Sequence, residues 1–103
     1  MRRYTGENGE WVVVEGTTAT VGLTRSALET LGEIVWIELP KKSSMLQAGD
    51  TAVVVESAKA ATDIVSPLTG TVLESNEALV TSLQTLNEDP EGLGWLYRVS
   101  VFS

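Results

Sequence analysis

Short runs of apolar and β-branched residues dominate the sequence, separated by turn-forming residues about every eight to twelve positions. Trp-Val-Val-Val-Glu at 11–15 has the composition of a strand, and the Gly-Thr pair that follows is a turn signal. The run at 18–23 is therefore predicted to form a hairpin with the first. The predicted strands cover residues 11–15, 18–23, 34–39, 51–56, 62–65, 70–74 and 95–102. This spacing is typical of an all-β sandwich or a flattened barrel.

One stretch changes to a helical period. Thr24 is a good N-cap, Leu28 lies on the apolar face of the segment 25–31, and Gly32 stands where a helix commonly ends. We therefore predict one short helix over 25–31. Residues 76–87 are predicted to form a loop with a helical turn around 82–86.

Length and charge narrow the range of partners. A chain of 103 residues suffices for one domain, which we expect to span 1–103. Its net charge of −7 repels phosphate backbones and anionic lipid, so we expect neither a nucleic-acid nor a membrane partner. No apolar run approaches the roughly 18 residues of a membrane helix, and the start lacks the apolar core of a signal peptide. We expect a cytoplasmic monomer.

The sequence contains neither cysteine nor histidine. Thiolate nucleophiles, disulfides, the commonest general base and the commonest zinc ligand are therefore excluded. We expect no metal site and no catalysis by this chain. The enzymatic alternative is a hydrolase that uses Glu56 and Asp63, but both carboxylates should face water, where neither gains a raised pKa.

Two β-branched runs in residues 53–67 flank a tip of small residues from which Lys59 projects. With the turn centred on residues 59 and 60, Glu56 lies opposite Asp63, and such a pair of like charges is unfavourable. One explanation is a partner that recognises acids beside a lysine, and the other is a plain hairpin with a solubilising lysine. If Val54 faces the core, a carboxylate introduced there should unfold the hairpin.

An exposed lysine has a pKa of about 10.4, so Lys59 is a poor Schiff-base nucleophile at neutral pH. It is a good attachment point, because it is long and stands between Ala58 and Ala60. A separate enzyme would supply the activated acyl group. The alternative is an unmodified interaction module whose acidic surface binds a basic partner, in a salt-sensitive way that does not depend on Lys59.

The segment around this lysine, residues 56–67, has the sequence E-S-A-K-A-A-T-D-I-V-S-P. It resembles the lipoylation segment of the H protein of the glycine cleavage system, a family of lipoyl carriers. The resemblance continues in order through G-E-W-V, V-E-G-T-T-A-T-V-G-L-T, A-L-E-T-L-G-E-I-V-W-I-E-L-P, A-G-D, S-N-E-A-L and N-E-D-P-E-G-L-G-W-L. It covers nearly all of residues 3–100.

The resemblance implies a barrel-sandwich hybrid, a flattened lipoyl-domain-like barrel of two antiparallel sheets. Lys59 matches the lysine that is amide-linked to lipoic acid, and Glu56 matches an acid associated with recognition by lipoylating enzymes. Glu10, Asp63 and Ser66 match the cleft in which the loaded arm folds back.

The implied partners are a pyridoxal-phosphate-dependent glycine decarboxylase, a tetrahydrofolate-dependent aminomethyltransferase, dihydrolipoyl dehydrogenase and a lipoate-attaching enzyme. The carrier itself is then not an enzyme. A biotinyl domain shares this architecture, but biotin sites usually flank the lysine with methionine, whereas Ala58 and Ala60 stand here.

Two features depart from the family. Gly9 stands where members commonly have histidine, and the sequence ends at Ser103, before the C-terminal helix that members usually have. A relay that delivers lipoyl groups to 2-oxoacid dehydrogenases, or a redox role, therefore stays open. We expect the three tryptophans to be core or semi-buried packing residues; they are Trp11, Trp36 and Trp95.

Overall fold

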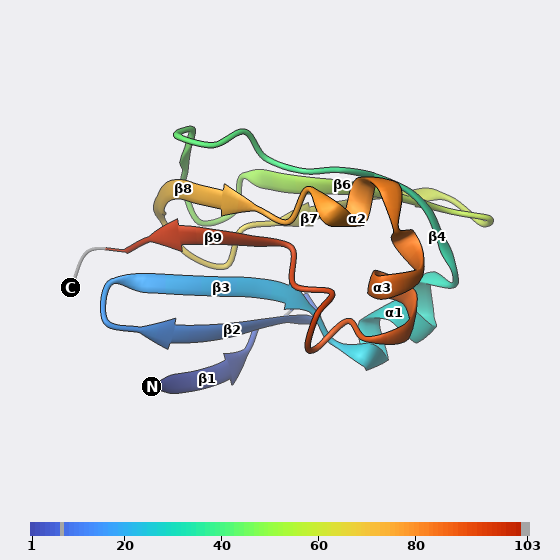
Figure 1. Ribbon diagram of the computed structural model, residues 1–103, viewed down its shortest axis with the longest axis horizontal. Helices are drawn as coiled ribbons and strands as arrows, with labels where there is room; N and C mark the ends of the chain where they lie inside the picture. Colours follow the sequence, from blue (N-terminus) through green and yellow to red (C-terminus); the bar gives the residue numbers. More distant parts are fainter. Residues whose placement is uncertain (7, 102–103) are drawn as a thin grey trace.

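Two antiparallel sheets and three short helices make up the computed structural model, which describes residues 1–6 and 8–101 (Figure 1). The strands are β1 (Arg2–Thr5), β2 (Glu10–Glu15), β3 (Thr18–Leu23), β4 (Ile34–Glu38), β5 (Met45–Leu46), β6 (Thr51–Ser57), β7 (Ala61–Val65), β8 (Gly70–Ser75) and β9 (Tyr97–Ser100). The helices are α1 (Arg25–Leu31), α2 (Ala78–Thr81) and α3 (Leu83–Glu88). The prediction of a mainly β fold is confirmed.

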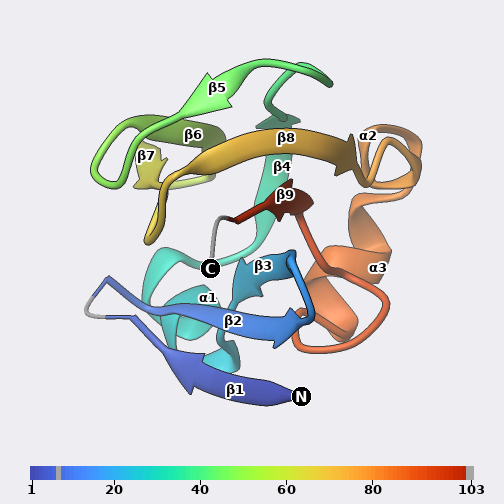
Figure 2. The ribbon, with the colours of Figure 1, turned by 90° about the vertical axis from the view of Figure 1, so that its left-hand side faces the viewer.

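The larger sheet has the strand order β1-β2-β3-β9-β8-β5, and the smaller has the order β4-β6-β7. Figure 2 shows the strands of the larger sheet following one another from β5 at the top to β1 at the bottom. Apolar side chains from both sheets form one buried cluster, to which Val12, Val21 and Val99 contribute from the larger sheet and Val53 and Val55 from the smaller. The core therefore lies between the sheets, as in other β-sandwiches.

Helix α1 follows its sequence signals closely. The Thr24 hydroxyl accepts a hydrogen bond from the Ala27 N–H, and the Gly32 N–H donates to the Leu28 carbonyl. Gly32 has φ +88°, a conformation that favours glycine at a helix end. The predicted bounds of 25–31 are confirmed.

Three elements were not predicted. All four residues of β1 are exposed, so it carries no apolar alternation, while β5 has two residues and α2 a single turn. The expectation of one helix is wrong, because α2 and α3 form where 76–87 was predicted to be mainly loop. The helical turn predicted around 82–86 corresponds to α3. The predicted last strand is shorter, at Tyr97–Ser100, and Phe102 lies outside the described residues.

All three helices gather at one end of the molecule, beside the tip of the β6–β7 hairpin (Figure 1). Among the described residues, no helix is long and apolar enough to cross a membrane.

Candidate functional site

The β6–β7 hairpin carries Lys59 at its tip. The Ser57 N–H donates to the Ala60 carbonyl, and the Ser57 hydroxyl accepts from the N–H groups of Lys59 and Ala60 at 3.2 and 3.4 Å. The turn therefore closes around Ala58 and Lys59, as a serine-capped tip. Ala58, Lys59 and Ala60 are all exposed, and neither ion pair found in the described part of the chain involves Lys59. The predicted exposure of Lys59 is confirmed.

The hairpin register differs from the prediction. Glu56 pairs with Ala61, and Asp63 pairs with Val54, because the serine-capped turn lies one residue earlier than expected. Glu56 and Asp63 are therefore diagonal neighbours on one outward-facing side of the small sheet, not directly opposed. Val54 shares that side, so it does not face the core.

Trp36 lies on the same outward side, because it pairs with Glu56 across β4 and β6. Its side chain is 44% exposed, so the expectation that it is a core or semi-buried residue is wrong. Trp11 is buried and Trp95 is half-buried, as expected.

A small cleft of about 270 Å³ lies between α1 and β7. Asp63 and Thr62 line it from β7, Ala27 and Leu31 line it from α1, and Gly9 belongs to its wall. The cleft is therefore mixed in character: Asp63 contributes a carboxylate from the lysine hairpin, and α1 contributes the polar Ser26 and Thr30 beside the apolar Ala27 and Leu31.

Gly9 leaves no room for a side chain. It has φ +87°, and an added Cβ would lie 2.6 Å from the Ala27 Cβ. Its carbonyl accepts hydrogen bonds from both the N–H and the hydroxyl of Thr24. A histidine at this position would have to displace α1. Glycine therefore allows α1 to lie close to the β1–β2 connection.

Glu10, the next residue, is only 2% exposed, and its Oε2 has no hydrogen-bond partner among the described residues. It does not line the small cleft, although its neighbour Gly9 does. A carboxylate buried without a partner is costly for stability, and this cost is characteristic of functional positions.

Ser66 is buried and is not among the residues that line the small cleft. Its hydroxyl donates to the Leu68 carbonyl at 2.7 Å; its backbone N–H donates to the Asp50 carbonyl, and its own carbonyl accepts from the Gly49 N–H. Its side chain influences the buried Tyr97 phenol, so Ser66 belongs to a buried polar group in the core.

Sequence reasoning missed Tyr97 as a member of this group. Burial raises the pKa of Tyr97 to about 12; the neighbouring Ser66 side chain opposes the rise, and the negative charge of Glu10 adds to it. The Ser66 hydroxyl donates its proton to the Leu68 carbonyl, and among the described residues the buried Tyr97 phenol oxygen has no hydrogen-bond partner. Strand alternation could have placed Tyr97 inward, but not beside these two partners.

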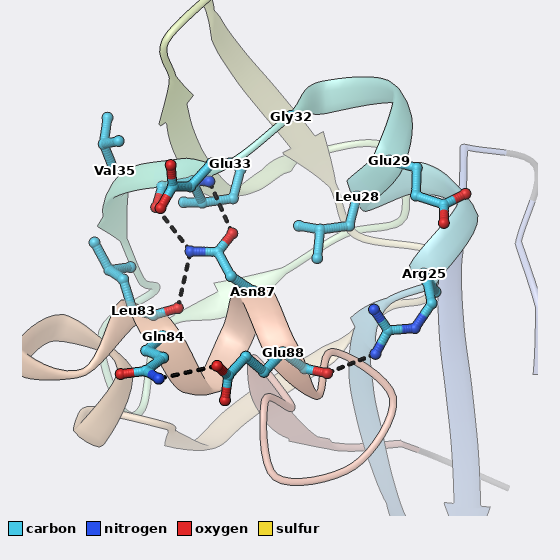
Figure 3. Close-up of a pocket in the computed structure, with 11 residues that line it drawn as sticks. Arg25, Leu28, Glu29, Gly32, Glu33, Val35, Leu83, Gln84, Asn87 and Glu88 are labelled. Atoms are coloured by element: carbon cyan, nitrogen blue, oxygen red, sulfur yellow. Dashed lines mark hydrogen bonds between the residues drawn. The ribbon is translucent and has the colours of Figure 1, made fainter.

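A second hollow, of about 860 Å³, lies on the other side of α1, against the start of β4 and α3 (Figure 3). Asn87 holds α3 to β4 through two hydrogen bonds with Ile34. The Ile34 N–H donates to the Asn87 side-chain oxygen, and the Asn87 side-chain NH₂ donates to the Ile34 carbonyl. The Arg25 guanidinium donates to the Glu88 carbonyl and joins α1 to α3. Lys59 borders this hollow, since its Cε lies 3.8 Å from where a Gly32 Cβ would stand.

These groups set what the end of the molecule can do chemically. The exposed Lys59 at the tip of the β6–β7 hairpin lies beside the larger hollow, and Asp63 of the same hairpin lines the smaller one. Within residues 1–6 and 8–101, no three acidic side chains come close enough together to hold a metal ion. The arrangement suits a tethered group that swings from Lys59.

Comparison with known proteins places this arrangement in a family. The family model described as "Glycine cleavage H-protein" matches residues 2–103. The chain belongs to the glycine cleavage H-protein family.

Relatives from distant bacteria agree with this assignment. The glycine cleavage system H protein of Dinoroseobacter shibae is 50% identical over 98 residues, which are 95% of this chain and 80% of that protein. The H protein of Thermotoga maritima is 42% identical over 101 residues, with 98% and 81% covered. This member of the H-protein family thus spans about four fifths of their length.

The fold agrees as well. The crystal structure of a glycine cleavage system H protein from Mycobacterium marinum superposes with a TM-score of 0.87 at 34% identity, covering 98% of this chain and 87% of that one. The two antiparallel sheets of this chain therefore form the barrel-sandwich of the H-protein family.

Proposed function

We propose that this protein is a lipoyl carrier of the glycine cleavage system, with lipoic acid amide-linked to Lys59. The observation that carries the proposal is the exposed lysine at the tip of the β6–β7 hairpin, in a chain of the H-protein family. The carrier is a non-catalytic component. We place it in the cytoplasm, as a single-domain monomer over residues 1–103.

The tip fits a lipoyl group. Its flanking residues are alanines, which leave the amine accessible to an attaching enzyme, and no carboxylate of residues 1–6 and 8–101 forms an ion pair with it. When bound, lipoate supplies a dithiol that takes up and releases the carried group. Glu56, three residues before Lys59 and exposed on the outer side, would mark the hairpin for the lipoylating enzyme.

The residues behind Lys59 would hold the arm between visits to partners. Asp63, at the small cleft, would attract a carried amine, and Ala27 and Leu31 of α1 would contact the apolar part of the arm. Glu10, the residue after Gly9, adds a buried carboxylate close to this cleft wall, whereas Ser66, which is buried and outside the cleft lining, would support the fold and not contact the arm. The partners are glycine decarboxylase, the aminomethyltransferase and dihydrolipoyl dehydrogenase, which would meet the same exposed hairpin in turn.

The attachment is tested by incubating the purified protein with lipoate, ATP and a lipoate ligase and measuring its intact mass. We expect a gain of one lipoyl group on the native chain and on Lys41→Ala and Lys42→Ala variants, which keep Lys59. Lys59→Arg should fold normally and gain nothing. No gain on the native chain, or an equal gain on Lys59→Arg, contradicts the proposal.

A further inference from the structure

Strand β4 turns two consecutive apolar side chains toward solvent. Ile34 pairs with Ser57 and Trp36 pairs with Glu56, so Val35 is an extra residue at a bulge. In a regular strand successive side chains point to opposite faces, so one of two consecutive residues would be buried. Here both are exposed, Val35 by 55% and Trp36 by 44%. Bulges commonly redirect side chains next to functional sites, and adjacent exposed apolar residues commonly mark an interaction surface.

The large hollow extends this apolar surface. Leu28 and Leu83 contribute apolar atoms to its wall, and Val35 lies at its edge. Its rim is acidic, with Glu29 at one side and Glu33 beside the end of α1 (Figure 3).

Three carboxylates around this surface are free. Within the described part of the chain, Glu29, Glu33 and Glu56 take part in no ion pair and no side-chain hydrogen bond. Arg25, the one cation among the described residues that line the hollow, keeps its positive charge while its guanidinium donates to the neutral Glu88 carbonyl. Three carboxylates line the hollow with it, Glu29, Glu33 and Glu88, so the surface still carries net negative charge around an apolar centre.

Lys59 stands at the border of this surface, against Gly32. We propose that Glu29, Glu33, Val35, Trp36 and Glu56, here called the docking face, form the surface on which the lipoate-attaching enzyme binds. This inference rests on the proposed function and extends it from the hairpin to β4 and to the hollow between α1 and α3.

The chemistry of attachment explains the charge of the docking face. The neutral Lys59 amine attacks the acyl carbonyl of lipoyl-adenylate; an amide bond forms, the bond between acyl carbon and phosphate oxygen breaks, AMP leaves, and the amine loses a proton to water. An enzyme that holds an anionic adenylate presents cations around it, and these repel an approaching lysine. Carboxylates around Lys59 offset this repulsion, and Val35 and Trp36 supply the apolar contact.

The test is the steady-state kinetics of lipoylation by a lipoate ligase, with this protein as the varied substrate. Trp36→Ser and the double variant Glu29→Gln/Glu33→Gln should each raise KM by about tenfold, with kcat unchanged. The effect of the double variant should vanish at high salt, whereas that of Trp36→Ser should persist. Val35→Ser replaces Trp36→Ser if the latter does not fold.

Matched controls lie on other parts of the molecule. Leu73→Ser removes an exposed apolar residue of the larger sheet, and Glu15→Gln/Glu77→Gln removes two exposed carboxylates elsewhere. Both should leave KM unchanged. If the docking-face variants keep the native KM, or the controls raise it equally, the inference is overturned while the proposed function stands; if native protein gains no lipoyl group, both fail.

Discussion

Lys59 projects into solvent because a single hydroxyl closes the turn beneath it. Ser57 accepts the N–H groups of Lys59 and Ala60, which lets a two-residue tip form without glycine. Neither Ala58 nor Lys59 has a positive φ. The tip therefore stays compact, and the exposed lysine side chain extends from it with its Cε beside Gly32.

Tyr97 makes stability depend on pH in the alkaline range. Its pKa is about 12 in the folded protein against 10 in an unfolded chain, mainly because burial disfavours the phenolate. The neutral phenol therefore stabilises the fold fully below pH 10, and we expect a loss of roughly 2 kcal/mol as the pH rises to 12. Urea unfolding at several pH values measures the loss.

The matched comparison is between two phenylalanine variants. Tyr97→Phe should flatten the decline between pH 10 and 12, whereas Tyr4→Phe, at a partly exposed position of β1, should leave it unchanged. An unaltered decline in Tyr97→Phe would show that other groups, such as the lysines, cause it.

At the scale of elements, the β6–β7 hairpin separates a core side from a partner side. Val55 is buried, and its neighbour Val54 faces outward beside Asp63. We expect Val55→Asp to cost more than about 3 kcal/mol, because it buries an unpaired charge. Val54→Asp should cost about 1 kcal/mol or less, the repulsion from Asp63 across the strands. Urea midpoints measure both.

The contrast between these neighbours tests which side of β6 faces the core. Equal destabilisation by the two variants, or a larger effect at Val54, would contradict the outward position of Val54.

Helix α1 has a comparable double role. Ala27 and Leu31 line the small cleft on one side, while Leu28 and Glu29 line the large hollow on the other. One helix of two turns thus separates the proposed resting place of the arm from the proposed docking face, and both lie within reach of Lys59.

At the scale of the whole molecule, the larger sheet ties the two ends of the chain together. Strand β9 lies between β3 and β8, so residues from the first quarter and the last tenth of the chain are hydrogen-bonded neighbours. Unfolding of one part should therefore remove the support of the other, which favours a single cooperative transition.

Gly70→Ala tests this coupling. A Cβ at Gly70 would overlap the Ser100 carbonyl of β9, so β8 and β9 must separate, at about 3 kcal/mol. Tryptophan fluorescence and far-UV circular dichroism should report the same lowered midpoint. Gly16→Ala is the control: its Cβ meets open space, and only its φ of +60° is strained, so we expect about 1 kcal/mol. Separate midpoints for the two probes would contradict the coupling.

Much of the fold could be predicted because its signals are local. The β-branched runs indicated seven strands, and Thr24 and Gly32 indicated both ends of α1. The exposure of Lys59 followed from the small residues around it. By contrast, β1 is a polar edge strand that pairs only because β2 offers a free edge, so nothing within its own residues predicts it.

The features that surround the lysine depend on contacts between distant segments. The hairpin register depends on a serine cap, the exposure of Trp36 on a bulge at Val35, and the large hollow on Asn87 joining α3 to β4. Backbone preference and side-chain period are properties of a few consecutive residues, and these set the strands, α1 and the position of the lysine along the chain. Pockets and buried polar groups form only when packing brings separate segments within a few ångströms, so their shape and charge arise with the assembled core.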